Sequence, residues 1–249
     1  MKILISGING KMGKEIYSQA KLANIAVACG IDTSTMGEFD CPVYKKFGDF
    51  NFLCDAIVDF SSPSLLPDLL NFASTTATPI VIGTTGYSNE DLIKIRNASE
   101  KTAIFKSDNF SLGIYTLIKL AKQAVSMLDG YDIELIEYHH NNKADSPSGT
   151  AKAIASAICE TSKSDKHLCY NRHGNCKRAK SEIGIHSVRG GGIVGTHEVL
   201  LLGDDDYITI KHDAINKSVF AKGALKAAKY LIGKPNGLYN MNDLVIQSK

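Results

Sequence analysis

The chain has 249 residues, of which 44% are apolar and 22% charged, and its formal net charge is +2. This composition is typical of a globular protein and excludes a disordered or collagen-like chain. The balanced charge gives no electrostatic reason to expect binding to nucleic acid. At roughly 150 residues per domain, the length predicts one large domain or two small ones.

Targeting signals and cysteine usage predict the compartment. No stretch approaches the roughly 20 apolar residues of a membrane span, and the apolar run after Met1 is too short for a secretory signal. The six cysteines form no CxxC pair, so we expect a cytoplasmic protein with free thiols and no membrane contact. Cys169, His173 and Cys176 have the spacing of half a zinc site, but a fourth ligand is missing. Free surface thiols are favoured there, and no metal is expected.

The first hundred residues alternate short apolar runs with amphipathic stretches. Strands are predicted over 2–6, 25–31, 56–59, 79–82 and 103–106, and helices over 11–22, 62–73 and 89–99. This alternation of strand and helix predicts an α/β fold, with a parallel sheet covered by helices on both faces.

The pattern changes after about residue 109. Helices are predicted over 112–128, from the turn at 147–150 to about 160, and over 218–232. A strand is predicted over 132–138, a polar exposed loop over 161–180, and successive antiparallel strands over 183–188, 194–202 and 207–211. We interpret this part as an α+β domain followed by a closing C-terminal helix.

A glycine-rich turn, Gly7-Ile8-Asn9-Gly10-Lys11-Met12-Gly13, lies between the first strand and the first helix. Such a turn lets backbone N–H groups approach a pyrophosphate at the helix N-terminus. Asp32 ends the second strand, where a carboxylate can accept hydrogen bonds from an adenosine ribose. Dinucleotide binding is favoured over a plain strand–turn–helix corner. Asp32 is not followed by an Arg, which favours NADH, whereas Lys11 leaves NADPH use open.

Three further turns, at residues 59–63, 83–86 and 107–111, follow later predicted strands. Each alone is compatible with ordinary turn chemistry. Because ligands of open parallel sheets bind beyond the carboxyl ends of strands, the three together favour a nicotinamide-ribose site.

The densest group of reactive side chains lies in residues 134–151. His139 and His140 titrate near neutral pH and can supply a proton. Lys143 adds a positive charge, and the helix that starts near Gly149 offers free N–H groups to a carboxylate. These residues could grip and protonate a small dianion. A polar surface loop and a metal site are the alternatives.

Residues 137–143 and 147–151 resemble the signature of the 4-hydroxy-tetrahydrodipicolinate reductase (dihydrodipicolinate reductase) family. The resemblance implies a Rossmann-type dinucleotide-binding domain over 1–110 and 217–249. It also implies a substrate-binding and oligomerisation domain over 111–216 with an open mixed sheet, assembled as a homotetramer. The implied reaction is the reduction, by NADH or NADPH and with loss of water, of the dicarboxylate 4-hydroxy-2,3,4,5-tetrahydrodipicolinate to 2,3,4,5-tetrahydrodipicolinate in lysine biosynthesis.

The resemblance also implies roles for single residues. His139 would be the proton donor and Lys143 its catalytic partner, while His140, Gly149 and Thr150 would hold the substrate carboxylates. The implied cofactor site comprises Gly7, Gly10, Lys11, Met12, Asp32, Gly83, Thr84, Thr85, Ser107, Asn109 and Phe110.

Two other functions are compatible with parts of this pattern. The first is another two-domain NAD(P)-dependent amino-acid dehydrogenase, of the aspartate or homoserine type. The second is a non-catalytic NAD(H)-binding sensor, which would not need His139, Lys143 and Thr150 together.

Overall fold

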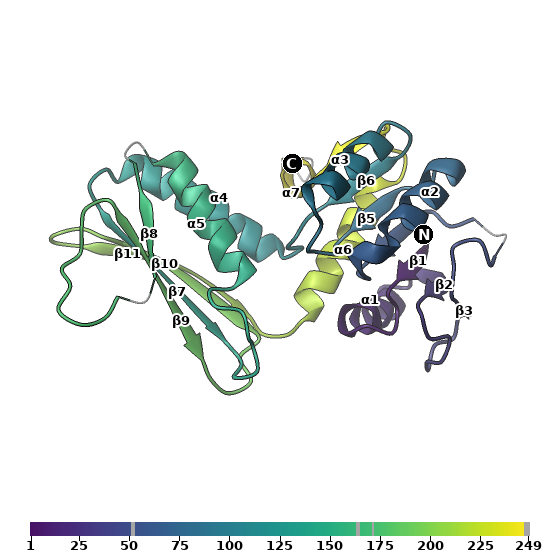
Figure 1. Cartoon of the computed structure of the whole chain (residues 1–249), viewed down its shortest axis with the longest axis horizontal. Helices are drawn as coiled ribbons and strands as arrows, with labels where there is room; N and C mark the ends of the chain where they lie inside the picture. The colour runs from purple at the N-terminus through teal and green to yellow at the C-terminus, as the bar shows by residue number, and fades with distance from the viewer. Residues whose placement is uncertain (51–52, 163–164, 171, 247–249) are drawn as a thin grey trace. The chain divides into compact units, whose positions relative to one another are not determined.

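The computed structural model describes residues 1–50, 53–162, 165–170 and 172–246. The chain folds into two compact units, which we call the first unit (Met1–Phe110 with Lys217–Lys249) and the second unit (Ser111–Asn216). The first unit therefore contains both ends of the chain, purple to blue and yellow in Figure 1, whereas the second unit is continuous.

A parallel sheet of seven strands forms the centre of the first unit. Its strands are β1 (Lys2–Ser6), β2 (Ala26–Ile31), β3 (Val43–Tyr44), β4 (Ala56–Asp59), β5 (Ile80–Ile82), β6 (Ala103–Lys106) and β12 (Gly237–Tyr239). They lie in the order β12-β6-β5-β4-β1-β2-β3. The order reverses between β1 and β4, and at such a switch point ligands bind beyond the carboxyl ends of the strands. The predicted Rossmann-type fold is confirmed.

Helices pack on both faces of this sheet. The unit contains α1 (Lys11–Leu22), α2 (Leu66–Thr76), α3 (Asn89–Ala98), α6 (Ser218–Leu231) and α7 (Met241–Ile246), with a 3₁₀ turn at Pro63–Leu65. Leu69 of α2 and Ile95 of α3 share a core with Leu4 of β1. On the other face α6 packs on α1 and on β4, β5 and β6. Burial on both faces explains why the strands are apolar throughout rather than alternating.

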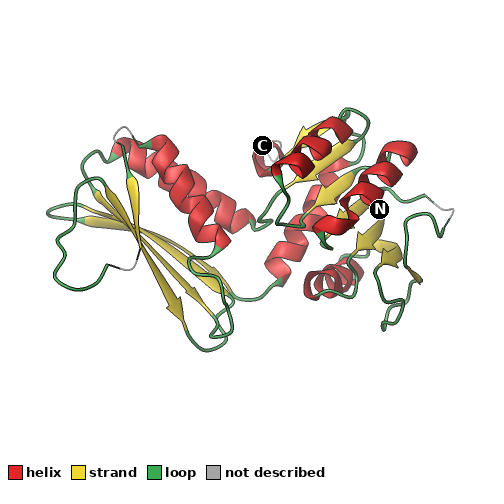
Figure 2. Cartoon of the chain, in the orientation of Figure 1, coloured by secondary structure: helices red, strands yellow, loops and turns green. Residues whose placement is uncertain are grey.

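The second unit combines a five-stranded mixed sheet with two helices, α4 (Leu112–Met127) and α5 (Gly149–Thr161) (Figure 2). Its strands are β7 (Asp132–His139), β8 (His167–Tyr170), β9 (Glu182–Arg189), β10 (Gly195–Leu202) and β11 (Tyr207–Ala214). Alternate residues of β7 are buried, and Ile133 and Leu135 pack against Ile154 of α5. Because side chains alternate along a strand, Glu137 and His139 lie on this same buried face.

The predicted order of the last strands needs two corrections. The stretch 161–180, expected to be a loop, contains β8, which pairs in parallel with β9. The strands at 183–188 and 194–202, expected to be successive neighbours, are separated by β7, which pairs with both. A hydrophobic pattern identifies which face of a strand is buried but not which strand lies beside it. The antiparallel pairing of β10 with β11 is confirmed.

Candidate active site

The glycine loop lies at the carboxyl end of β1. Gly7 has a φ of +80°, and its nitrogen donates a 2.8 Å hydrogen bond to the carbonyl of Ile31. A Cβ on Gly7 would lie 2.6 Å from the carbonyl oxygen of Phe60, so only glycine fits. None of the described side chains caps α1 at Gly10. The first N–H groups of α1 are therefore positioned to receive an anion such as a pyrophosphate.

Asp32 lies beside this loop, directly after β2. Its Oδ2 accepts the backbone N–H of Asn9 at 3.0 Å, and the Asn9 amide donates to the carbonyl of Ser34 at 2.7 Å. Asn9 stands where dinucleotide-binding loops often have a glycine, and here it ties the two loops together. Lys11, exposed, and Met12 begin α1. The structure thus brings the predicted loop residues and Asp32 to one corner of the first unit.

The turns after β4 and β5 are joined by a buried carboxylate. Asp59, which is fully buried, accepts hydrogen bonds from the hydroxyls of Ser61 (2.5 Å) and Thr84 (2.6 Å). The Thr84 hydroxyl also accepts the backbone N–H of Ser61 at 2.8 Å. Burial raises the pKa of Asp59, and these hydrogen bonds oppose the rise only in part. Thr84 therefore supports the turn from inside, whereas the neighbouring Thr85 is exposed.

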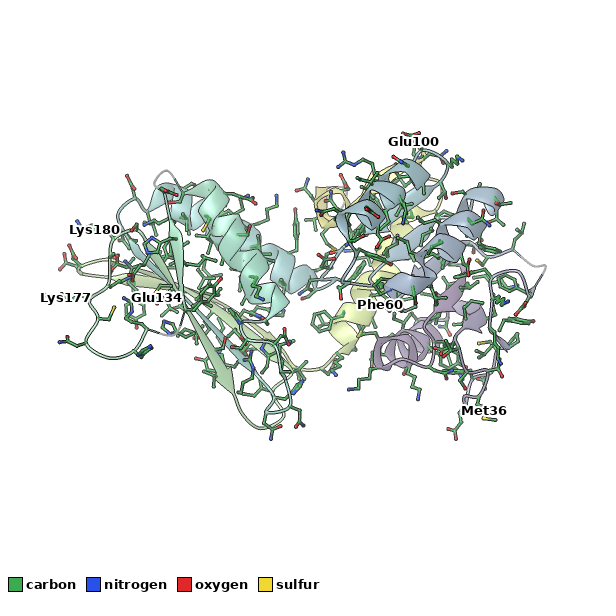
Figure 3. All side chains as sticks on the ribbon, viewed as in Figure 1. Met36, Phe60, Glu100, Glu134, Lys177 and Lys180 are labelled. Carbon is green, nitrogen blue, oxygen red and sulfur yellow. The ribbon has the colours of Figure 1, made fainter. Side chains whose placement is uncertain are left out.

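The turn after β6 completes this edge of the sheet. The Ser107 hydroxyl accepts the N–H of Asn109 at 3.2 Å and donates to its carbonyl at 2.7 Å. Phe110 is only 2% exposed and packs against Phe60, labelled in Figure 3, with ring centroids 5.5 Å apart. A Cβ on Gly83 would collide with the Phe60 ring. The Phe110 ring therefore packs behind this turn and supports it from inside.

In the second unit, β7 carries His139 and a carboxylate on the same face. The Nδ1 atom of His139 lies 2.5 Å from Oε2 of Glu137, and Glu137 is fully buried. β7 ends at His139, whose carbonyl accepts the N–H of Gly190 at 2.9 Å. The chain then turns, so the next side chain, His140, need not point to the opposite face as it would within a strand.

Arg189, at the end of β9, forms a two-pronged ion pair with Glu137. Its Nη1 and Nη2 atoms donate to the two carboxylate oxygens at 2.8 and 2.7 Å. The backbone N–H of Ser148 donates to Oε1 of the same carboxylate at 3.1 Å. One carboxylate thus connects the imidazole of His139, the end of β9 and the start of α5.

The charges in this network follow from its partners. Burial would raise the pKa of Glu137, but hydrogen bonds from Arg189, Ser187 and His139 outweigh burial and lower it to about 2. Burial lowers the pKa of His139, and the hydrogen bond and charge of Glu137 offset only part of that effect. The free protein at neutral pH therefore holds an ionised Glu137 next to a mostly neutral His139.

The loop that carries Lys143 and the N-terminus of α5 lie next to this network. Lys143 pairs with Asp145 at 2.8 Å, and the Lys143 hydrogen bond lowers the pKa of Asp145. The Ser148 hydroxyl caps α5 by accepting the N–H of Ala151 at 3.1 Å. A Cβ on Gly149 would meet only open space, so the first turn of α5, with Thr150, is accessible on that side.

His197 of β10 lies behind His139. The two rings meet edge to face with centroids 5.3 Å apart, and His197 Nε2 lies 3.2 Å from the Ser148 hydroxyl. Burial is the main cause that lowers the pKa of His197 to about 4, and repulsion from the protonated form of His139 adds to it. His197 is therefore a neutral spacer that orients its neighbours.

Three residues of this network, Glu137, Arg189 and His197, were not among the predicted site residues. Glu137 could have been predicted from the sequence. It is two positions from His139 on a predicted strand, so the two side chains must lie on the same face of the sheet. Arg189 and His197 are distant in sequence, and only the pairing of β7 with β9 and β10 brings them close.

The described residues offer neither a cluster of metal ligands nor a membrane-spanning helix. Within the described ranges, no group of three or more His, Cys, Asp or Glu side chains is arranged to hold a metal ion, and this includes Cys169, His173 and Cys176. For the same part of the chain, every helix falls short of the length and apolar character that a membrane crossing requires.

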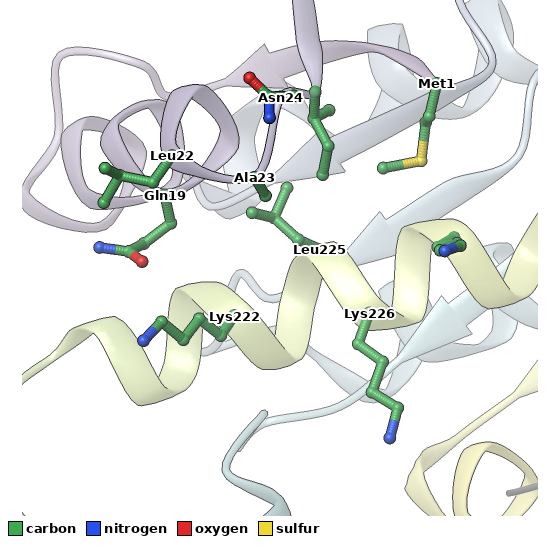
Figure 4. A pocket seen from close by; sticks show the side chains of 10 residues that line it. Met1, Gln19, Leu22, Ala23, Asn24, Lys222, Leu225 and Lys226 are labelled. Carbon is green, nitrogen blue, oxygen red and sulfur yellow. The ribbon is translucent and has the colours of Figure 1, made fainter.

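A cavity of about 560 Å³ in the first unit lies between the end of α1 and α6 (Figure 4). Met1, Leu22, Leu225 and Lys226 are among its lining residues. Met1 precedes β1, so this cavity is at the amino end of the strand. The glycine loop and Asp32 lie at the opposite, carboxyl edge, and the cavity is therefore separate from the candidate dinucleotide site.

Two family models match most of the chain. Residues 1–110 match a family model described as dihydrodipicolinate reductase, N-terminus, and residues 113–245 match its C-terminal counterpart. Similar proteins include 4-hydroxy-tetrahydrodipicolinate reductases of Caldanaerobacter subterraneus subsp. tengcongensis and Clostridium tetani. The first is 45% identical and covers 98% of both chains; the second is 44% identical and covers 97% of this chain and 96% of the relative.

Solved structures give a consistent result. A dipicolinate-bound dihydrodipicolinate reductase from Paenisporosarcina sp. TG-14 superposes with a TM-score of 0.80 at 25% identity, covering 96% of this chain and 97% of that one. An aspartate dehydrogenase from Thermotoga maritima has a TM-score of 0.52 at 12% identity, covering 94% and 97% of the two chains. At that identity the likeness shows a common fold only.

Proposed function

The chain belongs to the dihydrodipicolinate reductase family and is an oxidoreductase of the diaminopimelate route to lysine, and we propose that His139 and Lys143 carry its proton chemistry. The reaction reduces 4-hydroxy-tetrahydrodipicolinate to tetrahydrodipicolinate. It consumes NAD(P)H and a proton and releases NAD(P)⁺ and water. The observation that carries the proposal is the buried group in which Glu137 holds His139 beside the capped start of α5.

The proposed substrate is a ring with two carboxylates. We propose that His140 and the first turn of α5, at Gly149 and Thr150, bind these carboxylates, because a helix N-terminus favours anions. Lys143 would add a positive charge beside them. Dipicolinate, the ligand named for the Paenisporosarcina relative, has the same two carboxylates, and we propose that it binds this chain at the same residues.

The first unit fits a dinucleotide. The free N–H groups at the start of α1 would bind the pyrophosphate, and Gly7, which has no Cβ, would let it come close to the backbone. Asp32 would accept hydrogen bonds from the adenosine ribose hydroxyls. The remaining proposed cofactor-site residues are Gly10, Lys11, Met12, Gly83, Thr84, Thr85, Ser107, Asn109 and Phe110. When bound, the nicotinamide supplies a hydride. We propose a preference for NADH, because a carboxylate at Asp32 would repel a 2′-phosphate.

The test is the oxidation of NADH by the purified protein, with substrate made in situ from pyruvate and aspartate semialdehyde. His139→Gln should lower kcat by about 10²-fold or more, because a positioned proton donor contributes that much, while the Kd for NADH stays within a factor of two. His167→Gln, which removes an exposed imidazole, is the control and should change neither value.

No turnover above the blank would refute the proposed function, and equal losses of turnover and NADH binding would assign His139 a structural role. Turnover of aspartate or homoserine with NAD⁺ would instead support the amino-acid dehydrogenase alternative. Comparing kcat/KM for NADH and NADPH in the same assay tests the proposed cofactor preference.

We also propose that the chain forms a homotetramer in the cytoplasm. The face of the second sheet that points away from α4 and α5 presents the apolar side chains of Ile136, Tyr138 and Leu200 beside the ion-paired carboxylates of Glu134 and Glu198. We propose that this mixed face associates with other copies. All six cysteines are unpaired thiols, as in a reducing compartment. Light scattering should give a mass near four times 26.9 kDa, and a monomer mass would contradict the assembly.

A further inference from the structure

We infer that Glu137 is a positioning residue that keeps the Nδ1 atom of His139 protonated throughout the reaction, so that Nε2 is the atom that gives up and regains the proton. The inference rests on the proposed function, because it assigns the proton-donating atom of a residue proposed there.

Both carboxylate oxygens of Glu137 accept two hydrogen bonds each, which fixes the orientation of the side chain. Oε2 accepts from His139 Nδ1 (2.5 Å) and Arg189 Nη1 (2.8 Å), and Oε1 accepts from Arg189 Nη2 (2.7 Å) and the Ser148 N–H (3.1 Å). Two of these contacts come from a permanently charged guanidinium. The carboxylate is therefore ionised and can only accept hydrogen bonds, so the atom of His139 that faces it must be an N–H.

The other ring nitrogen, Nε2, lies next to Gly195. A Cβ on Gly195 would lie 3.1 Å from Nε2, closer than ordinary van der Waals contact. Glycine at this position avoids that close contact, and the ring of His197 packs edge to face against the imidazole. Because Glu137 occupies Nδ1, Nε2 is the nitrogen left for a reacting partner.

Arg189 connects this carboxylate to the second proposed catalytic group. Its Nη2 also donates to the carbonyl of Asp145 at 2.8 Å, and the Asp145 carboxylate binds Lys143 at 2.8 Å. A single guanidinium therefore fixes both the carboxylate behind His139 and the loop that carries Lys143. Its planar fork makes these contacts at once, which a lysine could not do.

The proton balance follows from these contacts. In the free protein His139 is neutral, with a proton on Nδ1 and a lone pair on Nε2. A bound dianion favours the imidazolium, so Nε2 takes a proton from solvent. Transfer of that proton to the substrate breaks the Nε2–H bond and restores the neutral Nδ1–H form, while Glu137 remains ionised. The charged or titratable groups that face His139 are Glu137, Arg189, Lys143 and His197.

The first measurement uses the unaltered protein. Nitrogen NMR of the histidine rings above pH 8 should show His139 with a protonated Nδ1 and an unprotonated Nε2. In calorimetry with dipicolinate at pH 7.5, in buffers of different ionisation enthalpy, binding should take up a fraction of a proton. A dominant Nε2–H form of His139 would overturn the inference.

The second measurement uses Glu137→Gln, with Glu160→Gln as the matched control, an exposed carboxylate paired with Lys122 in the same unit. Glu137→Gln should lower kcat about 10²-fold, leave the Kd for NADH unchanged, and allow Nε2–H to become populated. Because Glu137 raises the pKa of His139, activity in the variant should also begin to fall at a lower pH.

The possible outcomes are distinguishable. Retention of kcat within threefold, or an unchanged ring protonation pattern in Glu137→Gln, would overturn the inference while leaving the proposed function intact. Absence of turnover in the unaltered protein would refute the proposed function, and the NMR result on His139 would still decide which nitrogen Glu137 fixes.

Discussion

In the part of the chain that the structure describes, each unit has one fully buried carboxylate near the end of a strand, and the two carboxylates have opposite kinds of partner. Asp59 in the first unit has hydroxyl partners, Ser61 and Thr84, and its pKa is raised by burial. Glu137 in the second unit has the guanidinium of Arg189, and its pKa falls to about 2. The partners therefore decide the charge of a buried carboxyl group. Asp59 organises turns, whereas Glu137 supplies a permanent charge.

Of the changes considered, removal of the Arg189 guanidinium should lower the unfolding free energy most. Arg189→Met would leave Glu137 buried without a counter-charge, a change that typically costs about 3–5 kcal/mol of unfolding free energy. Urea unfolding monitored by circular dichroism measures the loss. The exposed pair of Lys122 with Glu160 provides the control, and Lys122→Met should cost less than about 0.5 kcal/mol.

A double variant sharpens this test. Glu137→Leu combined with Arg189→Met removes both charges, so it should recover most of the stability that Arg189→Met loses. If Arg189→Met alone lowers the unfolding free energy by less than about 1 kcal/mol, then the guanidinium is not what makes the pKa of Glu137 low and that of Asp59 high.

A fall in pH should change the stability contributions of His197, in the second unit, and Asp59, in the first unit, in opposite directions. The folded-state pKa of His197 is about 4, below its ordinary 6.5, so the unfolded chain binds the proton first as pH falls. Stability from His197 is complete above pH 6.5 and is lost as pH falls toward 4, by about 2 kcal/mol between pH 7 and 5. The raised pKa of Asp59 has the reverse consequence, a gain in stability as pH falls.

His197→Asn isolates this contribution. The difference in unfolding free energy between the unaltered protein and the variant should shrink by about 2 kcal/mol from pH 7 to pH 5. His173→Asn, at an exposed site, should leave that pH dependence unchanged. A pH-independent difference for His197→Asn would show that this imidazole is not held neutral by burial.

The smallest expected effect concerns Asp59. Thr84→Val removes one donor to the carboxylate with little change of shape and should cost about 1–2 kcal/mol. Because the ionised form suffers most, the loss should be greater at pH 8 than at pH 5. Thr85→Val, one residue further and exposed, should cost under about 0.5 kcal/mol. Equal losses at both pH values would mean that Asp59 does not change its protonation state between pH 5 and pH 8.

Local signals made the first unit and part of the second predictable from sequence. The predicted helix over 11–22 and strand over 56–59 match α1 and β4, because apolar spacing and flanking turns suffice within a short window. The proximity of the glycine loop to Asp32, which accepts the backbone N–H of Asn9, was predictable because both follow neighbouring strands of the predicted parallel sheet.

Non-local pairing explains what the sequence did not reveal. Arg189 lies opposite His139 in the register of β7 with β9, although the two are 50 positions apart. β3 and β12 have two and three residues, too few to produce a recognisable alternation. β8 was hidden in a polar stretch because its residues are at most half-buried. The network around Glu137 depends on the pairing of β7 with β9, which brings Arg189 to that carboxylate.

The return of the chain to the first unit affects the order in which the two units can fold during translation. α6 buries eight of its residues there, yet it follows the whole second unit in the chain. During translation, residues 1–110 leave the ribosome well before the helix that covers one face of their sheet. The continuous second unit can close first, which reverses the usual N-terminal-first order of domain folding. A nascent chain stalled near residue 216 would therefore display the uncovered sheet to chaperones.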